Sequence, residues 1–162
     1  MTANHIGATL WVAQAAPATN DTTGFEALTW VQVKGIQTLP VLGVSHSGID
    51  VPDLATGFTA SVKGAAAGRD STLSYRRIAA DAGQIDVEEQ AVDADGIGSV
   101  KLAYGSGAVG ADGPAVETGD RVIYAQGYFH SFEPNQATDS SYEGATVSFR
   151  QNDFTVEGTE PA

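Results

Sequence analysis

The sequence contains no cysteine among its 162 residues, and only 8 of them are lysine or arginine. The absence of cysteine excludes disulfides, thiolate catalysis and zinc sites built on cysteine. The 20 acidic residues bring the net charge to −12, which disfavours two classes of partner. A protein that binds nucleic acid needs lysine and arginine side chains to replace the counterions of the phosphates. A protein that binds an anionic membrane needs the same side chains. By itself, the acidity indicates no more than a well-solvated surface.

Long apolar runs are also missing, since no stretch approaches the ~20 apolar residues that a membrane-spanning helix needs. The segment Ala8–Ala18 faintly resembles a secretion signal. No lysine or arginine precedes it, however, and it contains Gln14 and Pro17. We therefore expect a first strand at Thr9–Gln14 followed by a loop, and no membrane association.

Glycine, in contrast, is abundant, with 19 residues that separate short runs of valine, threonine and aromatics. This pattern is typical of an all-β protein, and 162 residues are enough for one domain with a real core. We therefore expect a single domain over 1–162. The predicted strands are Thr9–Gln14, Leu28–Ile36, Phe58–Lys63, Ser71–Ala79, Ser99–Tyr104, Asp120–Phe132 and one within Tyr142–Val156.

The connections include several long loops. We expect a mobile N-terminal region with a loop at 15–27, a long loop near 39–57, a further loop at 105–119 and a short acidic tail at 157–162. The residues 64–70 read as a small-residue turn. A loop as long as 39–57 is usually functional or becomes ordered against a partner.

One helix is predicted, at about residues 82–93. Asp81 has the side chain of an N-cap, and Gln84 lies three residues later, which is a variant of the capping box in which Gln84 reaches back to the cap. Ala82, Ile85 and Val92 share one side with Glu89, and Val87 and Ala91 lie on another, so the apolar stripe is thin. A helix this short needs a sheet to pack against.

The strand Asp120–Phe132 carries aromatic or aliphatic residues on both faces, with Tyr124, Tyr128 and Phe132 on one and Ile123 and Phe129 on the other. One face of a small antiparallel sheet is usually solvated. The second face is therefore covered either by another subunit or by the predicted helix, and the sequence leaves both open.

No motif predicts a catalytic, cofactor-binding or metal site. The run Gly105–Gly110 matches G-x-G-x-x-G, but the residues after it cannot begin the helix that a pyrophosphate site needs. Asp93–Gly96 resembles the start of a calcium loop without its later ligands and reads better as a helix stop. Ser45–Ser47 places hydroxyls beside an imidazole with no orienting acid, and His5 and His130 are isolated. We therefore expect a non-enzymatic protein without a cofactor.

The run Tyr75–Ala91 resembles the strand-to-helix segment of siphophage major tail proteins, the tail tube subunits, and of the related tube proteins of gene transfer agents. That family often has an aspartate, one residue and then Gly-Gln ahead of a helix, and the matching positions here are Asp81, Gly83 and Gln84. The order of elements is similar from about Leu28 to Gly158.

This resemblance implies an antiparallel β-sandwich or barrel with one flanking helix. It further implies a structural subunit of a virion tail, made in the host cytoplasm, in which six copies form a ring and rings stack into a hollow tube. Partners would be other copies and the tape measure, tail terminator and baseplate proteins. DNA would pass along the lumen without specific binding, and we expect an acidic, net negative lumen because phosphates slide past a wall that repels them.

Two other classes remain open. A carbohydrate- or ligand-binding β-sandwich from a cell surface or baseplate would use exposed aromatics, for which Trp11 and Trp30 are candidates, although both are expected in the core. An enzyme would need a cleft with a perturbed titratable group. The sequence does not distinguish a contractile from a non-contractile tail.

Overall fold

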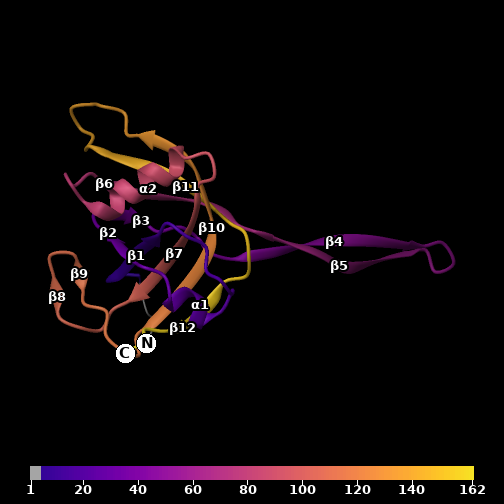
Figure 1. Ribbon diagram of the computed structural model, residues 1–162. Helices are drawn as coiled ribbons and strands as arrows, with labels where there is room; N and C mark the ends of the chain where they lie inside the picture. The colour runs from indigo at the N-terminus through magenta and orange to yellow at the C-terminus, as the bar shows by residue number, and fades with distance from the viewer. Residues whose placement is uncertain (1–4) are drawn as a thin grey trace.

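A computed structural model describes residues 5–162, and its body is built on one antiparallel sheet (Figure 1). The sheet order is β2-β1-β7-β10-β11-β6-β3, and β12 also pairs with β10. Its strands are β1 (Ala8–Ala13), β2 (Val31–Val33), β3 (Ile36–Thr38), β6 (Asp70–Arg76), β7 (Ile97–Tyr104), β10 (Arg121–Pro134), β11 (Gly144–Gln151) and β12 (Val156–Thr159). The mainly antiparallel β fold with a flanking helix is therefore confirmed.

The sheet curves round so that one bent segment borders both of its edges. Strand β2 pairs with β1, strand β3 pairs with β6, and only Lys34 and Gly35 separate β2 from β3. Gly35 has a φ of +71°, and a Cβ at this position would lie 2.6 Å from the carbonyl oxygen of Arg76. The predicted strand Leu28–Ile36 is therefore divided into two short strands, because the bend requires a residue without a side chain.

The main core fills the interior of the curved sheet and is closed by helix α2 (Ala82–Val92). It comprises residues from both halves of the sheet and one from the helix: Leu10, Val12, Val33, Leu73, Tyr75, Val87, Val100, Leu102, Ala125, Phe129, Ala145, Val147 and Phe149. Of the two sides with apolar residues, the helix buries the one that carries Val87. Gly83, Gln84, Val87 and Gln90 are buried, whereas Ile85 and Val92 are exposed.

A second, smaller cluster lies on the opposite face of β10 and is covered by a helix that the sequence did not predict. Helix α1 (Thr22–Glu26) lies inside the expected 15–27 loop and is capped by Asp21, whose carboxylate accepts from the backbone N–H of Gly24. Phe25 is fully buried and stacks on Tyr124 with a ring-centroid distance of 5.0 Å. Threonine and glycine are weak helix formers, so burial of Phe25 holds this turn.

Over the first half of β10, both faces of the strand are thus covered by the same chain. The main core covers one face, and α1 covers the other. Beyond that, a register shift between Phe129 and Ser131 against β11 marks a bulge. The bulge moves Phe132 back to the main core and leaves His130 exposed. The assignment of Phe132 to the same face as Tyr124 was wrong, because an extra residue reverses the alternation of side chains.

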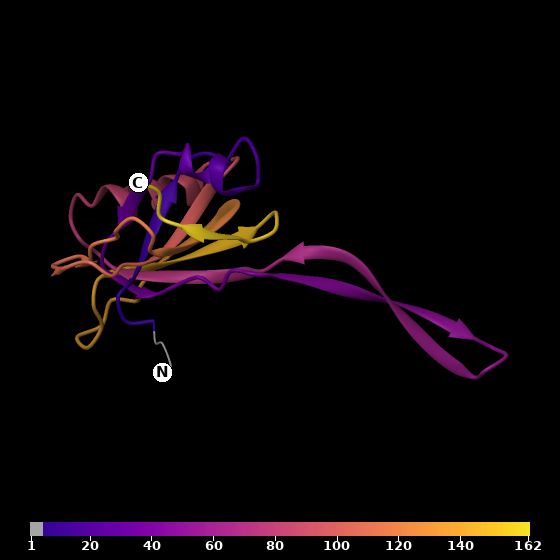
Figure 2. The ribbon, with the colours of Figure 1, turned by 90° about the horizontal axis from the view of Figure 1, so that it is seen from below.

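A two-stranded arm leaves the body and is the main departure from the predicted strands and loops. Strands β4 (Val44–Asp53) and β5 (Phe58–Gly68) pair with each other alone and extend far from the body (Figures 1 and 2). The residues 44–53 were predicted within a loop near 39–57, and 64–68 within a turn. Gly48, Pro52 and Ala65–Ala67 have weak strand propensity, so pairing across the hairpin, not composition, makes this segment extended.

The remaining differences are small. The loop at 105–119 contains a minimal hairpin of β8 (Val109–Gly110) and β9 (Gly113–Pro114). The expected acidic tail forms β12, because Val156–Thr159 pair with the first half of β10. None of the helices within residues 5–162 has the length and apolarity needed to cross a membrane.

Candidate assembly surfaces

The sequence motifs do not form a chemical site. The run Gly105–Gly110 leads into the β8–β9 hairpin, so no helix N-terminus is available there for a phosphate. Asp93 ends α2 and Gly96 follows with a φ of +56°, as expected for a helix stop. His46 lies on β4, with its ring 6.2 Å from that of Phe154. No group of three or more histidine, aspartate or glutamate residues that could hold a metal occurs within residues 5–162.

The predicted Asp81–Gln84 pair is present but only half of it works as a capping box. The carboxylate of Asp81 accepts from the backbone N–H of Gln84 at 3.0 Å. The side chain of Gln84 does not reach back to the cap. It accepts from the N–H of Ile78 and donates to the carbonyls of Lys34 and Arg76 at 2.7 and 2.8 Å. Gln84 therefore joins the start of α2 to the bend between β2 and β3.

The base of the arm is tightly fixed to the body. Gln151, which is 2% exposed, accepts from the N–H of Gly43 at 2.9 Å and donates to the carbonyl of Asp153 and the hydroxyl of Thr155. On the returning strand, a Cβ at Gly68 would lie 1.8 Å from the carbonyl oxygen of Gln151. Only glycine allows this close approach, so the sequence sets where the arm leaves the body.

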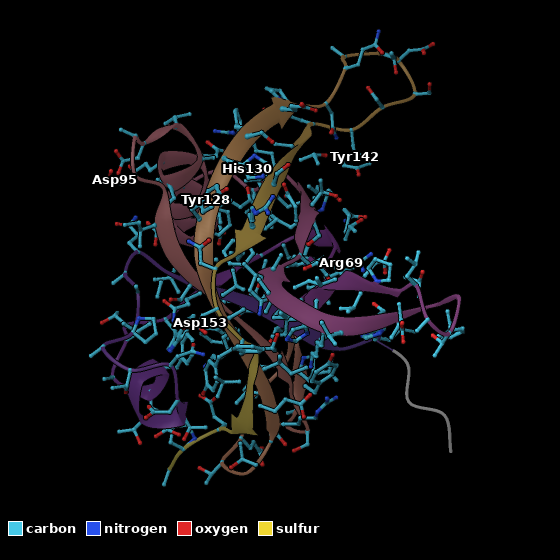
Figure 3. The ribbon with its side chains drawn as sticks, turned by 90° about the vertical axis from the view of Figure 1, so that its right-hand side faces the viewer. Arg69, Asp95, Tyr128, His130, Tyr142 and Asp153 are labelled. Atoms are coloured by element: carbon cyan, nitrogen blue, oxygen red, sulfur yellow. The ribbon has the colours of Figure 1, made fainter. Side chains whose placement is uncertain are left out.

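A second clamp holds the segment that leads into the arm. The hydroxyl of Ser71 accepts from the N–H of Val41 at 2.8 Å and donates to its carbonyl at 3.1 Å. The backbone N–H of Arg69 donates to the carbonyl of Gly43. Figure 3 looks along the arm toward the body, with Arg69 at the arm's base and Tyr128 and His130 on β10 beside it. The arm is thus fixed at its base, while its outer part is held only by its own ladder of hydrogen bonds.

The arm has one apolar face that nothing within residues 5–162 covers. Ile49 is opposite Val62, and Val51 is opposite Ala60, so their side chains share one side of the ribbon. Val51 is 47% exposed, and Phe58, near the tip, is 71% exposed. The other side carries Asp50, Thr59, Ser61 and Lys63. An isolated two-stranded ribbon is marginal in water at best.

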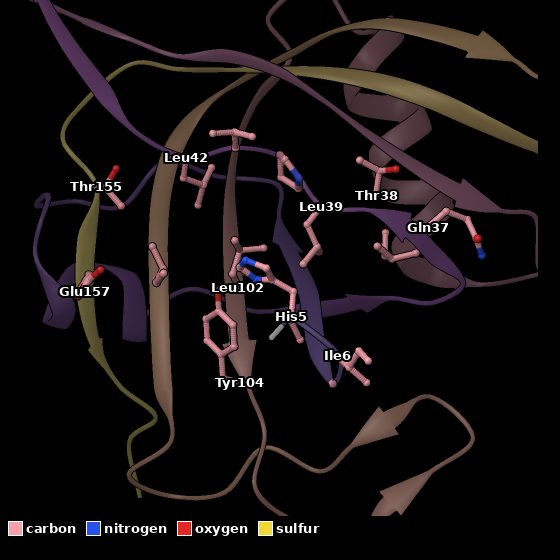
Figure 4. A pocket seen from close by; sticks show the side chains of 16 residues that line it. His5, Ile6, Gln37, Thr38, Leu39, Leu42, Leu102, Tyr104, Thr155 and Glu157 are labelled. Carbon is pink, nitrogen blue, oxygen red and sulfur yellow. The ribbon is translucent and has the colours of Figure 1, made fainter. Parts of the chain in front are cut away.

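An apolar groove of about 1040 Å³ opens on the body (Figure 4). One wall consists of Ile36, Leu39 and Leu42, and the other of Leu102, Tyr104 and Ile123. All except Tyr104 belong to the main core or pack against it, so the groove is an edge of the core that reaches the surface. Its rim is polar, and the ring of His5 lies 6.2 Å from that of Tyr104.

The two tryptophans are not an exposed binding platform. Trp11 and Trp30 are half-buried, pack against the second cluster and enclose the ammonium of Lys101, which lies 4.8 and 5.6 Å from their ring centroids. Lys101 donates to both carboxylate oxygens of Glu160 at 3.1 Å. The expectation that both tryptophans belong to the core is met in part, because they pack against the second cluster without being fully buried. Their role here is to shield a buried ion pair that holds the C-terminal segment.

The outer side of α2 combines exposed aliphatic and acidic residues. Val92 is 74% exposed, and Asp86, Glu89 and Asp93 lie on the same helix. Burial and the neighbouring charge of Glu89 raise the pKa of Asp86, which the hydrogen bond from Gln14 partly offsets. This surface adds to the strong acidity of the body.

No protein-family model matches the sequence, and no curated protein matches it significantly. Solved structures do match. The match to a sheath/tube terminator of the PVC extracellular contractile injection system covers 98% of this chain and 97% of the terminator chain, with a TM-score of 0.65 and 7% identity. The SPP1 tail tube subunit covers 96% and 78% with a TM-score of 0.62 and 13% identity.

The tube-terminating cap of the anti-feeding prophage covers 93% of this chain and 88% of its own, with a TM-score of 0.57 and 13% identity. Identities this low establish the fold alone. The matches extend over nearly the whole chain, beyond the short segment that carries the sequence resemblance. The chain therefore has the fold shared by tail tube and tube terminator proteins of phage tails and related injection systems.

Proposed function

We propose that this protein is a non-enzymatic structural subunit of a phage-type tail tube. Six copies form a ring, and rings stack into a hollow conduit. The observation that carries the proposal is an arm with an uncovered apolar face on a body with the tail-tube fold. Such a face is unfavourable in a free monomer and becomes buried when another copy covers it.

The architecture of the body supports the same conclusion. Within residues 5–162 the main sheet has its interior filled and its edge strands β2 and β3 kept to three residues each, which limits unspecific pairing. The arm is long, with up to 11 residues per strand, and its base is fixed by Gln151 and Gly68. A projecting element with a fixed direction is suited to a repeated contact between identical subunits.

The charge supports a conduit for DNA. With a net charge of −12, an assembled tube presents many carboxylates, and phosphates are repelled by such a wall instead of pairing with it. We propose a net negative lumen on this ground. Tape measure, tail terminator and baseplate proteins are the expected partners, the virion tail is the expected location, and the host cytoplasm is the expected site of synthesis. A siphophage tail remains the specific form suggested by the sequence.

The test uses purified protein, sedimentation velocity and negative-stain microscopy. We expect rings or tubes of uniform width. A variant with 47–65 replaced by a short Gly-Ser turn should keep the far-UV circular dichroism of the body and lose assembly. A wild-type protein that stays a monodisperse monomer at high concentration would contradict the proposal. A tube whose lumen is net basic by cryo-electron microscopy would contradict the DNA-sliding argument alone.

A further inference from the structure

We infer that the apolar face of the arm binds in the groove of a second copy of this chain, between the wall Ile36–Leu42 and the wall formed by β7 and β10. The inference rests on the proposed function, because it names the surface that receives the arm during assembly. Both halves of the contact are present in one chain: an apolar ribbon face without a cover, and an apolar groove at the edge of the core.

The chemistry of the arm limits what it can bind. Its apolar side is a row of branched side chains, Ile49, Val51 and Val62, and toward the tip it carries Phe58 with Asp53 as its cross-strand partner. A complementary surface must be apolar, elongated and open at the surface. Burial of this row removes several large apolar side chains from water, which favours association.

The groove meets these requirements better than two other hollows of the body do. Its walls are aliphatic with one tyrosine, and its volume of about 1040 Å³ has room for several side chains. Glu157 also lines it, but this residue is exposed and pairs with Arg121. The hollow beside Trp11 and Trp30 contains the ion pair of Lys101 and Glu160. The hollow beside Phe132 is bordered by Arg77, Glu88 and Glu143. Both present charged groups that an aliphatic row would leave unsolvated.

Charge also favours a second copy as the partner. The body is strongly acidic, so two bodies repel each other at close range. The arm, in contrast, carries formal charge only at Asp50, Asp53 and Lys63 within residues 44–68. A second acidic copy therefore repels the arm only weakly. With about 3.3 Å per residue, its strands reach roughly 35 Å, which is enough to span from one body onto a neighbour.

Cysteine cross-linking tests the contact, because the native chain has no cysteine to interfere. A Val51→Cys protein is mixed under oxidising conditions with a Thr38→Cys protein that carries a size tag, where Thr38 is an exposed residue on the groove rim. We expect a mixed-size disulfide dimer. The matched control, Ser61→Cys, lies on the polar side of the same arm and should give at least fivefold less of this dimer, since two cysteines whose Cβ atoms point apart cannot form a disulfide.

The outcomes separate this inference from the proposed function. Rings or tubes that form without a preferred Val51–Thr38 cross-link would overturn the groove contact and leave the tail-tube proposal intact. Equal cross-linking of the Val51 and Ser61 variants would also overturn it, because it requires one face of the arm. Protein that neither assembles nor cross-links at any concentration would overturn both.

Discussion

The ammonium of Lys101 lies 3.1 Å from both carboxylate oxygens of Glu160, although the two residues are 59 positions apart. Lys101 is 4% exposed and is flanked by Trp11 and Trp30. This buried pair attaches the end of the chain to the centre of the sheet. The start of β12 is held by pairing with β10 and by packing of Val156 on the second cluster.

Glu160→Gln should lower the free energy of unfolding by about 2–3 kcal/mol, because it leaves the buried Lys101 ammonium without a counter-charge. Urea unfolding followed by circular dichroism measures the change. The exposed pair of Arg121 and Glu157, at 2.8 Å, provides the control. Glu157→Gln should cost less than about 1 kcal/mol, and equal losses for both variants would contradict the assigned role of the buried pair.

Gln90→Met should stabilise the protein. The side-chain amide of Gln90 is buried on α2, and neither its nitrogen nor its oxygen has a hydrogen-bond partner within residues 5–162. A buried unpaired polar group costs about 1–3 kcal/mol, and methionine has a similar shape without that cost. We expect a rise of about 1 kcal/mol in the free energy of unfolding. A loss of stability would mean that the amide is satisfied by a water molecule.

Gln151→Leu should loosen the base of the arm, because Gly43, Asp153 and Thr155 all lose a buried hydrogen-bond partner. We expect a loss of about 2–3 kcal/mol and faster amide hydrogen exchange at Gly43. The neighbouring variant Asn152→Ala removes an exposed side chain and should leave both unchanged. Unaltered exchange at Gly43 in Gln151→Leu would show that the clamp does not hold the arm.

Alkaline pH should unfold the protein through its buried tyrosines. Burial, together with the charges of Glu160 and Glu26, raises the pKa of Tyr124 to about 12. The folded state therefore holds this proton more tightly than the unfolded state, whose tyrosines have a pKa of about 10. The contribution to stability is complete below pH ~10 and is lost as the pH rises from there through 12.

Tyr124→Phe tests this linkage, since it removes the ionisable hydroxyl and keeps the ring that stacks on Phe25. The decline in the free energy of unfolding between pH 10 and 12 should become shallower in Tyr124→Phe than in wild type. Tyr75 contributes in the same sense, because burial and its hydrogen bond to Glu88 raise its pKa as well. An unchanged slope in Tyr124→Phe would contradict the assignment.

Local sequence signals determined the features that depend on neighbouring residues. The alternation in Ser99–Tyr104 and Asp120–Phe132 located the central strands β7 and β10. Asp81 located the start of α2 to the residue, because an N-cap acts over three positions. The same stretch carried the resemblance to tail tube proteins, whose fold the structure has.

Only the tertiary structure decided the features that depend on residues far apart in the chain. Phe25 makes a helix out of weak helix formers by reaching Tyr124, and Gln84 is a link between three backbone segments instead of a cap partner. Of the arm, the sequence predicted only the strand at Phe58–Lys63, which lies within β5. The rest became visible only as paired strands, since its glycine, alanine and proline content resembles a loop. The periodicity of a sequence indicates which face of an element is buried against its own chain. The apolar face of the arm is not buried within residues 5–162, so what covers it could not be predicted from the sequence of one chain.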